Sequence, residues 1–171
     1  SHFEELKRLL GGVAALGEAP LTVRDRLLSF GERLSIVLAR AHLVSQGIPA
    51  ETRVADEAGI LTTEEPGDAR ILDRSRNAVM DTIGSQAKDV VHVVAGFIGR
   101  DSAGRLTTLG RGGSDTTATF LASVLGGPAV LWKDTLGLLT GDPRVVESPQ
   151  VIERIHYLDA LELAHYGLPA I

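Results

Sequence analysis

The run DVVHVVAG, Asp89 to Gly96, is the feature that most constrains how this chain can fold. It is almost continuously apolar and rich in valine, which is typical of a strand buried on both faces of a parallel sheet. The runs Ile48 to Asp56 and Gly59 to Thr63 look like short strands or turns, and Ala129 to Trp132 looks like another short buried strand, with helix-like sequence between them. This alternation predicts an α/β fold, with an open, mostly parallel sheet sandwiched between helices.

Apolar residues at helical spacing predict the helices, at roughly Phe3 to Leu16, Val23 to Gln46, Ile71 to Gly84 and Leu158 to Tyr166. The second of these is the longest and carries two apolar stripes. The stronger stripe comprises Leu27, Phe30, Leu34, Val37, Leu38, Ala41 and Val44, and the weaker one, on the opposite side, comprises Leu28, Ile36 and Leu43. Two stripes predict a helix that is covered on two sides. A short edge strand is expected at Val151 to Ile155.

Glu32 follows Gly31 and falls on the weaker stripe of the long helix. A carboxylate among apolar neighbours needs a partner or a ligand, because burying an uncompensated charge is costly. A structural salt bridge would satisfy this need as well as a ligand would. The position of Glu32 alone leaves both interpretations open.

Composition narrows the class of protein. A length of 171 residues predicts one domain, and no apolar run approaches the length needed to span a bilayer. A net charge of −5 without a basic cluster argues against nucleic-acid binding. The absence of cysteine excludes disulfides and cysteine nucleophiles, and the histidines lack metal-ligand spacing, so we expect no zinc site. No signal-peptide pattern opens the chain, and we expect a cytoplasmic protein.

The stretch TTLGRGGSDTTAT, Thr107 to Thr119, indicates a ligand-binding turn. It combines three glycines with one cation, one hydroxyl and one carboxylate before a helix begins: Gly110, Arg111, Gly112, Gly113, Ser114 and Asp115. Backbone N–H groups at a helix N-terminus bind anions, and glycine lets the backbone approach the ligand closely. An arginine fork suits a carboxylate or phosphate, and Ser114 can cap the helix. A tight loop without a ligand is the alternative.

Candidate binding residues also follow the predicted strands, at the edge of a parallel sheet where ligands collect. Phe97 to Gly99 follow the valine-rich strand directly, and Lys133 and Asp134 follow Ala129 to Trp132. The turn TGDPR, Thr140 to Arg144, comes next. These charges favour a nucleotide or phosphate role, although solvated loop charges would have the same pattern.

Four motifs in this order resemble the aspartokinase branch of the amino acid kinase family: SFGERLS, GFIGRD, TTLGRGGSDTTA and KDTLGLLTGDPRVV. The resemblance runs from about residue 25 to residue 167. It implies transfer of the γ-phosphoryl group of MgATP to the side-chain carboxylate of L-aspartate, the first step toward lysine, threonine and methionine. It also implies an open sheet of eight mainly parallel strands, and a parent protein that forms a homo-oligomer.

The resemblance assigns roles to individual residues. On the substrate side it implies Glu32, Phe97, Arg111 and Ser114, with Arg111 holding an aspartate carboxylate in a two-pronged contact. At the transferring phosphoryl it implies Asp115, Gly112 and Gly113, the glycines as backbone donors. On the ATP side it implies Lys133, Asp134, Leu139 and Arg144. Lys133 and Leu139 stand where many relatives have threonine and tyrosine, and Leu136 where aspartate is frequent.

Two lysines of the family pattern have no counterpart in this sequence. No Lys-Phe-Gly-Gly strand precedes Phe3, and Pro169 stands where an ATP-contacting lysine is usual. We therefore expect residues 1–171 to be a partial kinase domain, truncated at both ends and without C-terminal ligand-sensing domains, that is weakly active or inactive alone. Two alternatives stay open. One is a non-catalytic domain that binds nucleotide or amino acid for regulation, and the other is a kinase for glutamate, acetylglutamate or a nucleotide.

Overall fold

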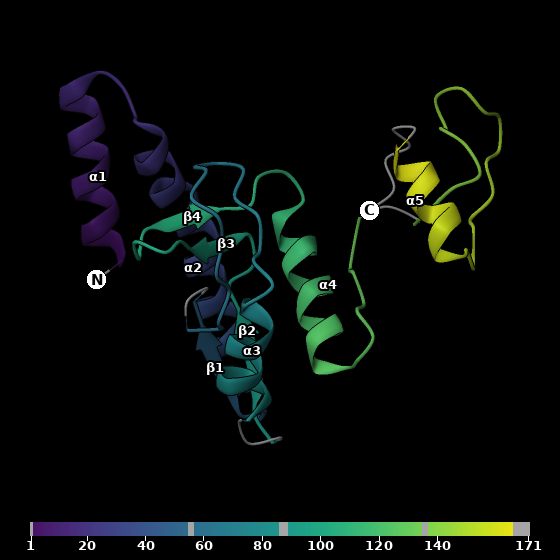
Figure 1. Cartoon of the computed structure of the whole chain (residues 1–171), viewed down its shortest axis with the longest axis horizontal. Helices are drawn as coiled ribbons and strands as arrows, with labels where there is room; N and C mark the ends of the chain where they lie inside the picture. The colour runs from purple at the N-terminus through teal and green to yellow at the C-terminus, as the bar shows by residue number, and fades with distance from the viewer. Residues whose placement is uncertain (1, 55–56, 86–88, 135–136, 166–171) are drawn as a thin grey trace. The chain divides into compact units, whose positions relative to one another are not determined.

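The computed structural model describes residues 2–54, 57–85, 89–134 and 137–165. The chain divides into two compact units, Ser1–Ala129 and Val130–Ile171, and each is described by itself. Figure 1 traces their elements along the chain. None of the described helices is both long enough and apolar enough to cross a bilayer.

The first unit begins with two helices. α1 spans His2–Leu16 and α2 spans Leu21–Ser45, so both predicted helices are confirmed. Gly17, at φ 73°, follows α1, and Pro20 immediately precedes α2. The two helices are joined by the Glu5 carboxylate, which accepts hydrogen bonds from Arg26 at 2.8 Å and Arg33 at 3.0 Å. The hydrogen bond from Arg26 is the main cause of the lowered pKa of Glu5.

The buried face of α2 differs from the predicted one. The fully buried side chains are Asp25, Ser29, Phe30 and Ile36. Leu38, on the stronger predicted stripe, is 71% exposed, and Leu28, on the weaker one, is 53% exposed. Each predicted stripe is therefore buried only in part, since Phe30 of the stronger stripe and Ile36 of the weaker one are buried. Hydrophobic spacing did not identify Asp25 and Ser29, because these are polar residues whose hydrogen bonds are satisfied inside the protein.

A parallel pair of strands packs against α2. β1, Ala50–Arg53, pairs with β2, Val91–Val94, in a register that places Ala50 beside Val91. Between them lie α3, Ser75–Val79, and the π-helical turn η1, Met80–Gly84, which together confirm the helix predicted there. The core combines apolar side chains of these elements and of the loops after the strands: Ile36, Ala58, Ile60, Val79, Ala95 and Ile98. The predicted α/β fold with parallel strands is confirmed.

An antiparallel hairpin follows β2, which the sequence analysis missed. β3, Ile98–Arg100, pairs with β4, Leu106–Thr108. Asp101 closes the turn, because its Oδ1 accepts hydrogen bonds from the N–H groups of Ala103 at 2.9 Å and Arg105 at 2.8 Å. The hairpin leads directly into the glycine turn and then into α4, Gly113–Leu125.

The second unit contains one described helix, α5, Tyr157–His165, which confirms the helix predicted there. Its expected stop, Gly167, lies outside the described residues. The predicted strand Ala129–Trp132 is wrong, because these residues are not in a strand and Trp132 is 93% exposed. Apolar sequence alone does not form a strand without a backbone partner, and the described residues place none beside it. The predicted edge strand at Val151 is reduced to one antiparallel bridge with Leu139.

Candidate functional site

The glycine turn opens α4 with a left-handed glycine rather than with a serine cap. The residue at the N-cap is Gly112, at φ 74°. Because glycine has no side chain, the cap has no side-chain hydrogen bond. The Gly113 N–H donates to the Gly110 carbonyl at 3.2 Å, and the Thr116 N–H donates to the Gly112 carbonyl at 3.0 Å. The expectation that Ser114 caps the helix is wrong, since its hydroxyl is engaged elsewhere.

The three glycines of the turn are needed for three different reasons. A Cβ on Gly110, at φ 72°, would lie 2.9 Å from the Gly67 carbonyl oxygen. A Cβ on Gly113 would lie 2.8 Å from Leu109 Cβ and 2.9 Å from Phe97 Cδ2, so this glycine permits close packing. A Cβ on Gly112 would meet no further atom within 4 Å, so the space on that side of the turn is open to a ligand, and here glycine is favoured by its φ of 74°.

Ser114 connects the turn to α2. Its hydroxyl donates a hydrogen bond of 2.9 Å to Glu32 Oε1. Glu32 is half-buried, and the partner that the described residues give its carboxylate is a hydroxyl rather than a cation. The contact brings together two residues that the sequence analysis assigned to the substrate side.

Phe97 adopts a strained backbone beside the same turn. Its φ is 67°, in the left-handed region that residues with a bulky side chain rarely adopt. Its N–H donates to Thr117 Oγ1 at 3.1 Å, and its carbonyl accepts from the Leu109 N–H at 2.9 Å. Thr117 is fully buried and donates its hydroxyl to the Gly113 carbonyl at 2.8 Å. Such strain persists only where neighbouring bonds hold it, and it is common at functional sites.

A cavity of about 540 Å³ lies next to Phe97 and Arg111. Its charged lining residues are Arg24, Arg111 and Asp68, together with Asp25, whose two carboxylate oxygens are already engaged by donors of the protein. The Arg111 side chain is exposed at its edge. A hollow that presents charges of both signs suits a small zwitterion, such as an amino acid, whose carboxylates and ammonium need opposite partners.

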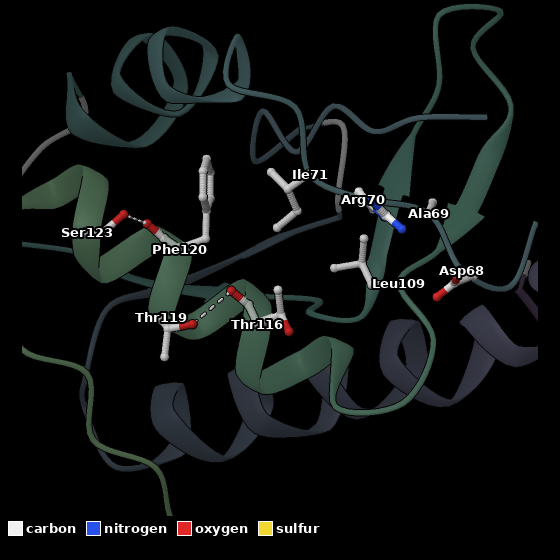
Figure 2. Close-up of a pocket in the computed structure, with 9 residues that line it drawn as sticks. All are labelled: Asp68, Ala69, Arg70, Ile71, Leu109, Thr116, Thr119, Phe120 and Ser123. Carbon is white, nitrogen blue, oxygen red and sulfur yellow. Dashed lines mark hydrogen bonds between the residues drawn. The ribbon is translucent and has the colours of Figure 1, made fainter. Parts of the chain in front are cut away.

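A second cavity, of about 490 Å³, lies along the side of α4. Figure 2 shows Thr116, Thr119, Phe120 and Ser123 on one side and the segment Asp68 to Ile71 on the other. Its helix hydroxyls are occupied, since Thr119 donates to the Thr116 carbonyl at 3.1 Å and Ser123 to the Phe120 carbonyl at 2.8 Å. None of the predicted site residues lines this cavity, and its hydroxyls have no hydrogen left to donate to a ligand.

The residues assigned to the ATP side all lie in the second unit. Lys133, Asp134 and Arg144 are exposed there, and Leu139 makes the bridge to Val151. Arg144 donates from Nη2 to Asp142 Oδ2 at 2.6 Å and from Nε to Oδ1 at 3.0 Å. This fork lowers the pKa of Asp142 to about 2. The contact between Arg144 and Asp142 organises the TGDPR turn. Leu136 lies outside the described residues.

The predicted site is thus gathered in two groups. Seven residues of the substrate side and of the transferring phosphoryl belong to the first unit: Glu32, Phe97, Arg111, Gly112, Gly113, Ser114 and Asp115. The four residues of the ATP side belong to the second unit. Both groups keep the roles given to them as predictions.

The model of the amino acid kinase family matches residues 4–171. The chain belongs to the amino acid kinase family. Within that family it is similar to aspartokinase 2, chloroplastic, of Arabidopsis thaliana, with 39% identity over 170 residues that cover 97% of this chain and 31% of the relative. It is also 41% identical to the aspartokinase of Corynebacterium efficiens over 150 residues, which cover 86% of this chain and 35% of that relative.

Solved structures agree with the sequence comparison. The crystal structure of Escherichia coli aspartokinase III in complex with aspartate and ADP matches this chain with a TM-score of 0.77 and 32% identity, covering 95% of this chain and 38% of that one. This amino acid kinase chain therefore spans about a third of the length of the relatives it matches. The resemblance to the aspartokinase branch is confirmed.

Two residues of this amino acid kinase site were missed by sequence reasoning. Thr117 links Phe97 to α4, and Asp25 lies fully buried beside the cavity at Arg111. Asp25 carried a signal, because it precedes Glu32 by seven positions and therefore shares its face of α2. Among the described residues, no three His, Cys, Asp or Glu side chains gather as a metal site.

Proposed function

We propose that the protein to which this chain belongs is an aspartate kinase. It would transfer the γ-phosphoryl group of MgATP to the side-chain carboxylate of L-aspartate, the first step toward lysine, threonine and methionine. The observation that carries the proposal is the hydrogen bond of 2.9 Å from Ser114 to Glu32, which unites the glycine turn with the GE motif of α2. The names of the relatives support it, since they are aspartokinases, and one structural relative was solved with aspartate and ADP.

The residues of the first unit suit the recognition of an amino acid. Arg111, at the edge of the charged cavity, would hold an aspartate carboxylate through its planar fork. Glu32, whose carboxylate keeps one oxygen beyond the bond to Ser114, would attract the ammonium group. Phe97 would shape the wall of the cavity. This arrangement would orient the second carboxylate toward the turn, where the reaction takes place.

The glycine turn suits phosphoryl transfer. An oxygen of the aspartate side chain would attack the γ-phosphorus, the bond from that phosphorus to the β,γ-bridging oxygen would break, and ADP would leave. The products are β-aspartyl phosphate and ADP, so atoms and charge balance. The N–H groups of Gly112 and Gly113 would donate to the transferring group, and Asp115 would orient charged groups around it, because such catalysis consists mostly of positioning and charge stabilisation.

The second unit would supply the nucleotide contacts. We assign Lys133, Asp134, Leu139 and Arg144 to ATP. Mg²⁺ is often bound by one or two carboxylates together with substrate phosphates. When bound, Mg²⁺ would neutralise charge on the phosphates.

The decisive experiment is an assay of the full-length protein with MgATP and L-aspartate. Hydroxylamine in the reaction traps an acyl phosphate as a hydroxamate, so aspartyl hydroxamate should accumulate together with ADP. Glutamate, N-acetylglutamate and nucleoside monophosphates serve as competing acceptors. Phosphorylation of one of these without aspartate would replace the proposal by another amino acid kinase activity. Saturable binding of MgADP or aspartate without transfer to any acceptor would indicate a regulatory domain.

We also propose that the full-length protein is a cytoplasmic homo-oligomer. The exposed apolar side chains Val37, Leu38 and Val44 on α2 support a surface for a partner. Sedimentation velocity at micromolar concentration tests the oligomer, and a monomer would contradict it. Cell fractionation tests the compartment, where chloroplast or other organelle enrichment is the contrary result, since the Arabidopsis relatives are named as chloroplastic.

A further inference from the structure

Asp25 is a buried carboxylate that hydrogen-bonds to two other segments. It lies on α2 with 2% of its surface exposed. Its Oδ2 accepts from the Gly67 N–H at 3.1 Å and the Thr108 N–H at 3.2 Å, and its Oδ1 accepts from the Thr108 hydroxyl at 2.8 Å. Both oxygens are therefore occupied by donors of the protein itself.

The two segments that Asp25 holds are the ones that define the glycine turn. Thr108 is the last residue of β4, two positions before Gly110. The Gly67 carbonyl lies where a Cβ on Gly110 would approach it to 2.9 Å, so this loop packs directly against the turn. Asp25 therefore fixes both the point where the turn begins and the loop that backs it.

Asp25 and Glu32 work from the same face of one helix. Seven residues make almost two turns of an α-helix, so the two carboxylates point in nearly the same direction. Asp25 binds the strand before the turn, and Glu32 binds Ser114 at the helix after it. The turn between Thr108 and Ser114 is thus held at both ends by α2.

We propose that Asp25 is a positioning residue that sets the distance between Glu32 and the glycine turn, and thereby the affinity of the site for aspartate. The proposal rests on the proposed aspartate kinase function. Asp25 acts through Thr108 and Gly67 and does not touch the substrate, because its oxygens are already engaged. Three donors converge on this one side chain, and a carboxylate accepts hydrogen bonds on both of its oxygens.

Two substitutions at Asp25 separate the hydrogen bonds from the charge. In Asp25→Asn, the amide oxygen can accept from both N–H groups, and the amide nitrogen can donate to the Thr108 hydroxyl, which then acts as acceptor. The KM of the full-length enzyme for aspartate should stay within about twofold of the parent value. In Asp25→Ala the donors lose their acceptor, and the KM should rise about tenfold, as expected from the cost of unmet buried groups.

A second pair keeps the test usable if Asp25→Ala does not fold. Thr108→Val removes only the hydroxyl and keeps the β-branched shape, and the KM for aspartate should rise about threefold to tenfold, the ordinary effect of one buried hydrogen bond. Thr108→Ser retains the hydroxyl and should leave the KM unchanged within about twofold.

Ser75→Ala is the structural control. Ser75 is also fully buried, and its hydroxyl donates to the Leu61 carbonyl at 2.8 Å and accepts from the Leu61 N–H at 3.0 Å. Its loss should lower the melting temperature without changing the KM. If Asp25→Ala and Thr108→Val also lower the melting temperature without changing the KM for aspartate, Asp25 is a purely structural residue and the proposal is wrong. An equal rise of KM in Asp25→Asn and Asp25→Ala would also overturn the proposal, because charge and not tethering would then matter.

Hydrogen exchange separates this inference from the proposed function. In Asp25→Ala, or in Thr108→Val if the former does not fold, the amides of residues 110–115 should exchange at least about threefold faster than in Ser75→Ala, since a tether protects local structure. This measurement needs no substrate. Faster exchange in a protein that does not phosphorylate aspartate would refute the kinase function and retain the tether. Unchanged exchange would refute the tether, whatever the activity.

Discussion

Ser114 donates its hydroxyl to Glu32 Oε1 at 2.9 Å, although 82 positions separate the two residues in the chain. The bond orients a carboxylate that would otherwise be free to rotate, and it leaves the second oxygen of Glu32 for another partner. It also places that carboxylate beside the first turn of α4, where backbone N–H groups favour negative charge. One contact therefore joins an acidic group suited to an ammonium to a helix end suited to an anion.

Replacing Glu32 by glutamine should weaken aspartate binding and leave the fold intact. The amide keeps an acceptor for Ser114 but removes the negative charge, and a hydrogen bond to a charged group contributes about 1.5–3 kcal/mol. The KM of the full-length enzyme for aspartate should rise at least tenfold, with the melting temperature nearly unchanged. Ser35→Ala is a matched control on the same helix, since the Ser35 hydroxyl is exposed and donates to the backbone carbonyl of Glu32 rather than to its carboxylate. An equal effect of both variants would contradict the assignment.

Gly113→Ala should destabilise the first unit. The added Cβ would lie 2.8 Å from Leu109 Cβ and 2.9 Å from Phe97 Cδ2, so the turn must shift, and overpacking of this kind costs about 1–3 kcal/mol. Denaturant unfolding measures the loss. Gly127→Ala is the control, because a Cβ there meets no atom within 4 Å and its φ is not positive. Equal stability of the two variants would show that the packing at Gly113 is looser than described.

Phe97→Gly should be more stable than Phe97→Ala. Both variants remove the ring, but only glycine adopts φ 67° without strain, and the difference is about 1 kcal/mol. Comparing the two unfolding free energies isolates the backbone term. If Phe97→Ala is as stable as Phe97→Gly, the backbone at position 97 relaxes once the ring is removed. The packing of the Phe97 ring, and not the surrounding backbone, would then cause the strain.

The carboxyl of Asp142 should titrate near pH 2. The hydrogen bonds from the Arg144 guanidinium depress the pKa of Asp142 from 3.8 to about 2. Because the folded-state pKa is lower than the unfolded-state pKa, the pair stabilises the folded state at pH values above the unfolded-state pKa. This contribution is complete above about pH 5 and is lost as the pH falls from about 4 toward 2. Carbon NMR of the carboxyl measures the pKa directly. In Arg144→Ala it should return toward 3.8, and a parent value near 4 would contradict the pair.

Arg144→Ala should also weaken nucleotide binding without affecting aspartate. The Arg144 side chain is exposed, and its planar guanidinium can donate two hydrogen bonds to one phosphate. Such a contact contributes about 1.5–3 kcal/mol, or roughly tenfold or more in affinity. Calorimetry of the full-length protein with MgADP measures the change. Arg154→Ala, at another exposed arginine of the same unit, is the control. A loss of aspartate affinity of equal size would place Arg144 outside the nucleotide group.

Sequence patterns predicted this fold best where apolar side chains decide the structure. α1 and α2 were found from their helical spacing, and β2 from its continuous apolar run. The expectation that this strand is buried on both faces is wrong, because Val91 is 44% exposed and the other residues of β2 are only partly buried. The hairpin of β3 and β4 was missed, since its short strands are rich in threonine and glycine. Ala129–Trp132 was read as a strand, although strand formation depends on a backbone partner that composition cannot reveal.

The candidate site was predictable as a set of residues rather than as an arrangement. The glycine turn and Glu32 were named from local sequence, and the structure joins them through Ser114. Asp25 escaped notice because an isolated aspartate on a helix is usually a solvated charge, and only the tertiary contacts to Thr108 and Gly67 distinguish it. The ATP roles of the residues in the second unit rest on the order of the motifs in the sequence and not on contacts in the structure.

The spacing of Asp25 and Glu32 on α2 makes this stretch intolerant of changes in length. Each residue of an α-helix advances the direction of the side chain by about 100°, so one inserted or deleted residue between them would turn one carboxylate away from its partner. The tip of the β3–β4 hairpin is better able to absorb insertions, because its residues are exposed and its contacts outside the turn are the exposed bonds of Ser102 and Arg105 to Glu64. The number of residues between the two carboxylates is therefore constrained, and a designer who transplants the site must copy α2 as one undivided piece.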